Sequence, residues 1–234
     1  GFAVQLENAR FDELDWKAEF TCDEIGAYLE AAHFPTHRLT SVAWAANYLE
    51  QITIRPALFG CFGLHEWAMV YRETQVRHAT PLRLSPAEIA DFVEAQELCC
   101  THFDAYRFFT PLAVPLNKHQ LTRTVTDQYD QRGCVHVTMD LYRYAFKLSP
   151  WLESELLADT FLLAWAAREL DMRASPYDLR NFGLEPICIE TREGKAEYVR
   201  QQQRLTSLGE PLRARLLSAY RNLLSARETE VIRG

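Results

Sequence analysis

Glycine is scarce in this sequence: 9 of its 234 residues are glycine, where a typical protein has about 7%. A β-barrel or β-sandwich needs many turn residues with positive φ, a conformation that glycine adopts most readily. Long apolar runs are also missing, because no run reaches the roughly 18 residues that indicate a membrane-spanning helix. We therefore expect neither a turn-rich β fold nor a membrane-bound protein.

The six cysteines contain no C-x-x-C pair, the spacing that is typical of zinc and redox motifs. They are also too few, in a chain of this length, for the disulfide framework of a small secreted domain. We expect them to be buried thiols of a reduced protein, and we expect a cytoplasmic location.

Basic charge is in deficit, with 25 Lys and Arg against 32 Asp and Glu and a formal net charge of −7. A broad nucleic-acid-binding surface normally carries a basic balance, so this composition argues against one, although a local basic groove is still allowed. Hydrophobic residues make up 48% of the chain and aromatic residues 12%, which is enough to bury a sizeable core.

Apolar residues recur at helical spacing along most of the chain, which favours a mainly α fold. We predict a single helical domain over residues 1–234, with a poorly defined lead-in at 1–20 and a few short strands or extended connectors, at 80–84 and 187–189. The predicted helices cover residues 21–32, 39–54, 64–71, 86–108, 135–148, 151–170 and 194–217, the last with a break near Gly209. Capping residues begin the helices at 21 and 86 and a further one near 175.

Four short segments combine acids, imidazoles and aromatic rings. In the first, Glu66 lies beside Trp67, so burial would raise its pKa and make it a general acid or base. The zinc-protease motif H-E-x-x-H is excluded, because Met69 stands where the second histidine belongs. A surface glutamate beside a core tryptophan is the structural alternative.

The second segment covers residues 100–109. On the predicted helix, Cys100, Asp104 and Arg107 share one side, while His102 points away from them. Carboxylate and aromatic faces together suit a flat heterocyclic ligand that is bound by stacking. A core helix with an Asp104–Arg107 ion pair explains the same residues.

The third and fourth segments lie further along the chain. His136 and Asp140 are four residues apart on a predicted helix, so they can bind one metal or each other, or simply form a solvated face. Asp171 and Arg173 close the most apolar helix and are candidates to line a site. Ser175, which follows them, is explained by helix capping.

Five stretches look familiar together: GCFGLHEWAMVYR (60–72), HFDAYRFFTPLAVPLN (102–117), MDLYRYAFKL (139–148), LDMRASPYDL (170–179) and IETREGKAEYVRQQ (189–202). They resemble a group of actinobacterial proteins labelled 3-methyladenine DNA glycosylase. The resemblance implies a hydrolase of an N-glycosidic bond that flips an alkylated purine into a pocket, with damaged DNA or a nucleoside-like molecule as partner. It makes Glu66, Asp104 and Asp140 the catalytic candidates. The substrate-binding candidates are Trp67, Tyr106, Arg107, Phe108, Asn117, Asp171, Arg173 and Tyr177.

Two alternatives stay open beside the glycosylase. In the first, a divalent metal cofactor is bound by His65, His102 and His136 together with the acids, as in a helical iron oxygenase. The Glu-x-x-His spacing that marks helical di-iron sites occurs once, at Glu30 and His33, where such sites need two copies. In the second, the protein is a non-catalytic module that binds a small planar ligand.

Overall fold

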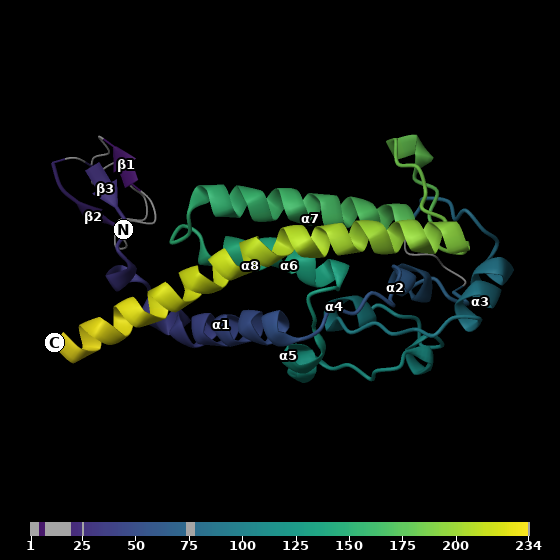
Figure 1. Ribbon diagram of the computed structural model, residues 1–234, viewed down its shortest axis with the longest axis horizontal. Coiled ribbons are helices and arrows are strands. Elements are labelled where there is room, and N and C mark those ends of the chain that lie inside the picture. Colours follow the sequence, from purple (N-terminus) through teal and green to yellow (C-terminus); the bar gives the residue numbers. More distant parts are fainter. Residues whose placement is uncertain (1–4, 8–19, 25, 74–77, 234) are drawn as a thin grey trace. The chain divides into compact units, whose positions relative to one another are not determined.

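The computed structural model describes residues 5–7, 20–24, 26–73 and 78–233 of the chain. Within that part, eight α-helices and one small antiparallel sheet form the regular structure (Figure 1). The predicted mainly α fold class is confirmed. None of the described helices combines the length and the apolar character that crossing a membrane requires.

The helices are α1 (Leu39–Ile54), α2 (Leu64–Ala68), α3 (Pro86–Glu94), α4 (Phe103–Tyr106), α5 (Thr126–Tyr129), α6 (Val135–Leu148), α7 (Ser154–Ala174) and α8 (Arg192–Arg233). Short 3₁₀ turns lie at Ala31–His33, Thr36–Arg38, Val114–Leu116, Arg123–Val125 and Arg180–Phe182. The strands are β1 (Gln5–Glu7), β2 (Thr21–Cys22) and β3 (Gly26–Tyr28).

Contacts between residues divide the chain into two compact units. The first consists of Gly1–Glu50, Leu141–Leu162 and Glu210–Gly234, and the second of Gln51–Asp140 and Leu163–Gly209. Helices α1, α6, α7 and α8 each contribute residues to both units. The second unit contains every site residue that is predicted from the sequence.

The small sheet lies in the first unit and has the strand order β1-β3-β2, with both neighbours antiparallel. It replaces the helix predicted over residues 21–32, so that prediction is wrong. The backbone of Gly26 donates to the Asp23 carboxylate at 3.1 Å, and the Asp23 backbone donates to the Gly26 carbonyl at 3.0 Å. These two bonds close a tight turn between β2 and β3, and the capping that was expected at Thr21 does not form. Most of the lead-in at 1–20 lies outside the described residues.

The helices α1 and α6 have the bounds that hydrophobic periodicity predicts. On α6, Val137, Leu141, Tyr144 and Leu148 recur every three or four residues, and each is at most 3% exposed. This stripe faces the protein core, and the residues between its members lie on other faces of the helix. His136 and Asp140 occupy a neighbouring stripe of the same helix.

The predicted helix over residues 86–108 begins correctly and ends too late. Ser85 and Glu88 form the capping box in front of α3. Beyond Glu94, however, the chain becomes extended, because Leu98 pairs with Asn117 in a parallel bridge. The buried Asn117 side chain also accepts from the Cys100 backbone at 2.8 Å and donates to its carbonyl at 3.0 Å. Cys100 and Asp104 therefore do not share a helix face.

Other boundaries also differ from the sequence prediction. Helix α2 ends at Ala68, and α7 begins at Ser154 after a turn. No α-helix begins near Ser175; its hydroxyl donates to the Met172 carbonyl at 2.7 Å and so finishes α7. The strand expected at 80–84 is reduced to one bridge between Leu82 and Tyr177, and residues 187–189 form no strand.

Helix α8 continues through Gly209 and Pro211 without the predicted break. Buried side chains lie on both sides of these two residues, from Leu205 to Leu223. Packing along this length offsets the local helix-breaking tendency of glycine and proline.

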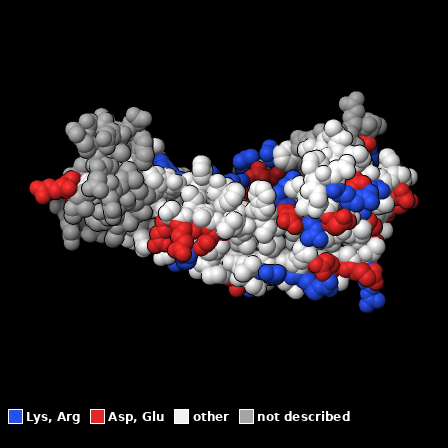
Figure 2. All heavy atoms as spheres, turned by 90° about the horizontal axis from the view of Figure 1, so that it is seen from above, with Lys and Arg blue, Asp and Glu red and all other residues white. Residues whose placement is uncertain are grey.

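Charged side chains of both signs lie near one another on one face of the molecule. On the face drawn in Figure 2, Lys and Arg lie interspersed with Asp and Glu instead of gathering in one basic patch. This distribution agrees with the acidic composition and offers no broad phosphate-binding surface on that face.

Candidate metal centre

The turn before α2 sets the direction of His65 and Glu66. Gly63 has φ +77°, and a Cβ at that position would lie 3.2 Å from the Ala174 side chain and 3.3 Å from the Tyr198 ring. Glycine is therefore favoured both by the backbone conformation and by the close approach of α7 and α8. Trp67 also holds α2 against Ala174, because its indole nitrogen donates to the Ala174 carbonyl at 2.9 Å.

Three segments that are far apart in the sequence bring two histidines and an aspartate together. His65 lies on α2, His136 on α6 and Asp171 near the end of α7. One ligand atom from each of the three lies within 4.8 Å of the other two. His65 Nε2 is 2.8 Å from Asp171 Oδ1, and His136 Nε2 is 3.9 Å from Asp171 Oδ2.

The pKa values of the three groups determine what a cation would meet at this cluster. Burial and the neighbouring His65 lower the pKa of His136 well below its ordinary value, so this ring is neutral. Burial opposes ionisation of Asp171, but the pKa of its carboxyl is lowered by His65, His136 and Arg168. Burial also disfavours a charged His65, yet Asp171 and Cys61 raise its pKa well above the ordinary value. His65 is therefore protonated beside Asp171, and a cation bound by His65 would have to displace that proton.

Other side chains orient these three. The Cys61 sulfur lies 3.4 Å from His65 Nδ1, the nitrogen that faces away from Asp171. Arg168 donates to Asp171 Oδ2 at 3.0 Å and to Glu66 Oε1 at 3.3 Å. Burial and then the Asp171 carboxylate raise the pKa of Glu66, the direction predicted from the sequence.

A second network adjoins the first at His136. The His102 ring stacks on the His136 ring, with centroids 5.2 Å apart and planes at 14°. His102 Nδ1 donates to the fully buried Asp130 at 3.1 Å, and its Nε2 lies 3.9 Å from Asp140 Oδ2. His136 and Asp140 thus share one face of α6, but the structure pairs each of them with a different partner.

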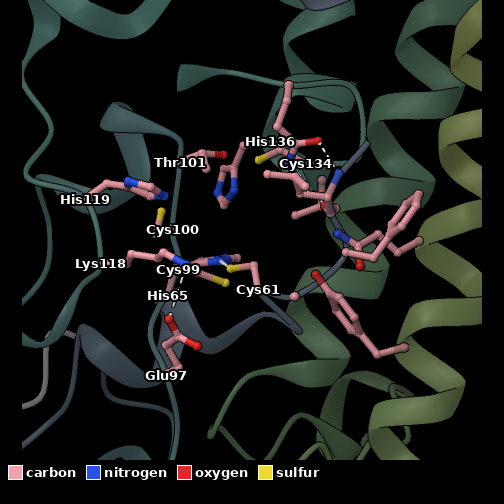
Figure 3. Close-up of a pocket in the computed structure, with 17 residues that line it drawn as sticks. Cys61, His65, Glu97, Cys99, Cys100, Thr101, Lys118, His119, Cys134 and His136 are labelled. Carbon is pink, nitrogen blue, oxygen red and sulfur yellow. Dashed lines mark hydrogen bonds and ion pairs between the residues drawn. The ribbon is translucent and has the colours of Figure 1, made fainter. Parts of the chain in front are cut away.

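Two cavities meet the cluster, and His136 lines both. The thiol-lined cavity, of about 240 Å³, contains His65 and four cysteines, namely Cys61, Cys99, Cys100 and Cys134. Figure 3 shows the labelled histidines and cysteines around this cavity. The aromatic cavity, of about 490 Å³, is lined by Glu66, Asp104, Phe108, Phe109, Arg168 and Tyr177 among others.

The structure brings six of the predicted site residues together around these networks: His65, Glu66, His102, His136, Asp140 and Asp171. Three more reach the aromatic cavity or its edge. Phe108 and Tyr177 line it, and Asp104 does so while pairing with Arg107 at 3.3 Å. The Arg107 guanidinium in turn lies over the Phe108 ring.

The remaining predicted site residues are buried in the core or bound to other parts of the protein. Trp67 is 0% exposed and packs against Phe92, so its ring faces are covered by protein. The Tyr106 hydroxyl donates to Gln120, and Arg173 donates to the Glu185 carbonyl. Asn117 fixes the extended segment around Cys100, as described above.

Sequence reasoning missed Cys61, Arg168 and Asp130. Cys61 lies four residues before His65 and Arg168 three residues before Asp171, so helical spacing from a candidate residue could have suggested both. Asp130 lies 28 residues from the histidine it contacts. Nothing in its local sequence indicates that contact.

Comparison of the chain with protein-family models, with curated proteins and with solved structures gives no match. Its function is therefore inferred from its own side chains.

Proposed function

We propose that this protein is an enzyme that depends on a divalent metal ion, bound by His65, His136 and Asp171. The observation that carries the proposal is the convergence of these three buried or half-buried side chains, with ligand atoms within 4.8 Å of one another. Ligands on one ion, with bonds of about 2.0–2.2 Å, lie roughly 3 Å apart. The contact of 2.8 Å between His65 and Asp171 already has this spacing, whereas His136 Nε2, at 3.9 Å from Asp171 Oδ2, has to move closer to bind the same ion.

The type of ligand indicates the type of ion. Two histidines and one carboxylate, with further coordination positions left for water or substrate, are typical of non-haem iron(II) enzymes. Histidine and carboxylate also suit zinc and manganese. Iron(II) is the ion that we expect to bind for function.

The surrounding residues fit a catalytic ion better than a structural one. Structural zinc sites are closed by four protein ligands, whereas this set supplies three. Two further side chains orient the ligands: Cys61 contacts the remaining nitrogen of His65, and Arg168 donates to Asp171. Glu66 contacts Arg168 and lines the aromatic cavity, where it can transfer a proton to or from a substrate.

Metal titration of the purified protein tests the proposal. Wild type, freed of metal by chelation, is titrated with iron(II) under nitrogen and separately with manganese(II) and zinc(II). The variants are His65→Ala, His136→Ala and Asp171→Asn. Each variant removes one ligand and should raise the Kd at least about 100-fold, because loss of a residue that only orients a ligand already weakens metal binding about 10- to 100-fold. His37→Ala, which removes an exposed imidazole outside the cluster, is the matched control and should bind like wild type. Equal binding by Asp171→Asn and wild type would reject the assignment.

Hydrolysis of an N-glycosidic bond is the second candidate, and the aromatic cavity favours it. This cavity combines Glu66 and Asp104 with the rings of Phe108, Phe109 and Tyr177. A flat base could stack there while a carboxylate activates water, as the resemblance to the labelled glycosylases implies.

Release of free base from alkylated DNA and from nucleosides checks this candidate. The assay uses metal-free and metal-loaded protein, and the released base is measured by chromatography. Activity that is lost in Glu66→Gln supports the candidate. No release from either substrate by metal-loaded wild type contradicts it, and leaves the metal assignment to be judged by the titration.

A further inference from the structure

His102 resembles His65 in its contacts: one ring nitrogen is held by a neighbouring side chain, and the other faces a carboxylate. It occupies the N-cap position of α4, it is 2% exposed, and its Nδ1 contacts the buried Asp130 carboxylate at 3.1 Å. That contact fixes the ring, so Nε2 is directed towards Asp140, whose Oδ2 lies 3.9 Å away. In His65, likewise, Nδ1 faces Cys61 and Nε2 faces a carboxylate.

This repeated arrangement is typical of histidines that bind metals. Such a histidine almost always donates its second ring N–H to a carboxylate or another acceptor, which fixes the tautomer and aims the other nitrogen at the ion. Asp130 has this position relative to His102. Its carboxylate is fully buried, and its backbone carbonyl also accepts from Arg55 at 2.8 Å, which holds the loop in place.

The His102–Asp140 pair is adjacent to the first cluster. The His136 ring contacts both the His65 ring and the His102 ring, with centroid distances of 4.5 Å and 5.2 Å. His136 and Asp140 come from the same face of α6, so this helix contributes one residue to the first cluster and one to the His102–Asp140 pair. Ions in two-metal centres are about 3.5–4 Å apart, so their ligand sets have to be neighbours, as the contacts of the His136 ring with His65 and with His102 make them.

We propose that His102 and Asp140 bind a second divalent cation next to the one at His65, His136 and Asp171, which makes the centre dinuclear. This inference rests on the proposed function. The second position takes the same class of ion, iron(II), manganese(II) or zinc(II), with water completing its coordination. A pair of ions activates a water molecule and stabilises both the attacking and the leaving oxygen in displacement reactions.

Manganese(II) is the probe for the test, because its bound quantity can be counted and neighbouring ions couple magnetically. Folded wild type is loaded with excess manganese(II), freed of unbound ion by gel filtration and analysed by mass spectrometry and electron paramagnetic resonance. We expect about two equivalents and a spin-coupled spectrum. His102→Gln should bind about one and lose the coupling, whereas the control His37→Ala should keep two.

Asp130→Asn separates a role in metal binding from a purely structural role, because it should change the affinity for one ion and not for the other. It should weaken the second equivalent about 10- to 100-fold and leave the affinity for the first within about twofold. Circular dichroism verifies that each variant is folded, and His102→Asn replaces His102→Gln if the latter does not fold.

The outcomes separate this inference from the proposed function. One equivalent in wild type, unchanged in His102→Gln, overturns the dinuclear centre, leaves the first site standing and makes Asp130, His102 and Asp140 an ionic network only. Two equivalents in both proteins also overturn the assignment to His102. No bound manganese(II), iron(II) or zinc(II) in wild type overturns both proposals.

Discussion

Cys61 shows how one side chain outside the ligand set can adjust a metal site. Its sulfur lies 3.4 Å from His65 Nδ1, and the Cys100 thiol and His65 together lower its pKa well below the ordinary value despite burial. A sulfur with this character accepts from the imidazole and keeps Nε2 directed at Asp171.

Replacing Cys61 by alanine should therefore weaken metal binding about 10- to 100-fold while the protein stays folded. The matched control is Cys99→Ala, which removes a thiol from the same cavity; we expect it to change the affinity by less than about threefold. Titration calorimetry with zinc(II) measures both. Equal affinities of the two variants would contradict the role given to Cys61.

The ion pair between Arg83 and Glu190 links residues far apart in the second unit. Two contacts, of 2.7 and 3.2 Å, join the guanidinium to the carboxylate, and Cys188 lies beside them. Burial opposes ionisation of Glu190, but its hydrogen bonds with Arg83 lower its pKa below the ordinary value. The folded state therefore binds a proton less readily here than the unfolded state, whose pKa is about 4.3.

Because the pKa of Glu190 is lower in the folded state, the ion pair stabilises the fold above about pH 5. This stabilisation is lost as the pH falls through the folded-state pKa. Glu190→Gln should cost about 1–3 kcal/mol at pH 7. The difference from wild type should shrink as the pH falls from 5 to 3. Urea unfolding of both proteins across this range measures it, and a difference that is constant with pH would argue against the ion pair.

At the scale of elements, the turn before α2 determines where two site residues lie. Gly63 and Gly183 both have positive φ, at +77° and +74°, but only Gly63 has side chains within contact distance of an added Cβ. Alanine at either position carries the cost of a left-handed backbone, about 1–2 kcal/mol. Alanine at Gly63 must also displace Ala174 or Tyr198.

We expect Gly63→Ala to lower the free energy of unfolding by about 2–5 kcal/mol in total, since overpacking adds about 1–3 kcal/mol to the backbone strain. It should also weaken metal binding, because α2 carries His65. Gly183→Ala, the control for backbone strain alone, should lose about 1–2 kcal/mol and bind metal like wild type. Thermal unfolding and metal titration distinguish the two.

Elements with a clear period could be predicted from the sequence, and those defined by tertiary pairing could not. Val137, Leu141 and Leu148 give α6 its correct bounds. The segment around Cys100 has apolar residues at helical spacing, yet Asn117 binds its backbone in an extended form. Likewise, Asp23 forms a turn where its neighbours suggest a helix.

The candidate site was predictable in its members but not in their grouping. His65, His136 and Asp171 were each singled out by local chemistry, although Asp171 was expected to bind substrate. Their convergence depends on the packing of α2, α6 and α7, which no local pattern encodes. The resemblance made Trp67 a candidate to stack a base in the pocket, but its side chain is 0% exposed and packs against Phe92.

At the scale of the whole molecule, bound metal should stabilise the folded chain. The ligands converge only in the folded state, so an ion at 100 times its Kd adds about 2.7 kcal/mol. In a chain of this size that raises Tm by roughly 5–11 °C. Differential scanning fluorimetry with zinc(II) or manganese(II) checks this, and the shift should vanish in Asp171→Asn. An equal shift in that variant would place the ion elsewhere.

Anomalous X-ray diffraction from crystals of the metal-loaded protein, collected on both sides of the metal absorption edge, locates the bound ion directly. We predict a peak about 2.0–2.3 Å from His65 Nε2, His136 Nε2 and an oxygen of Asp171. A peak at other residues, or none in crystals of protein loaded with iron(II), manganese(II) or zinc(II), would contradict it.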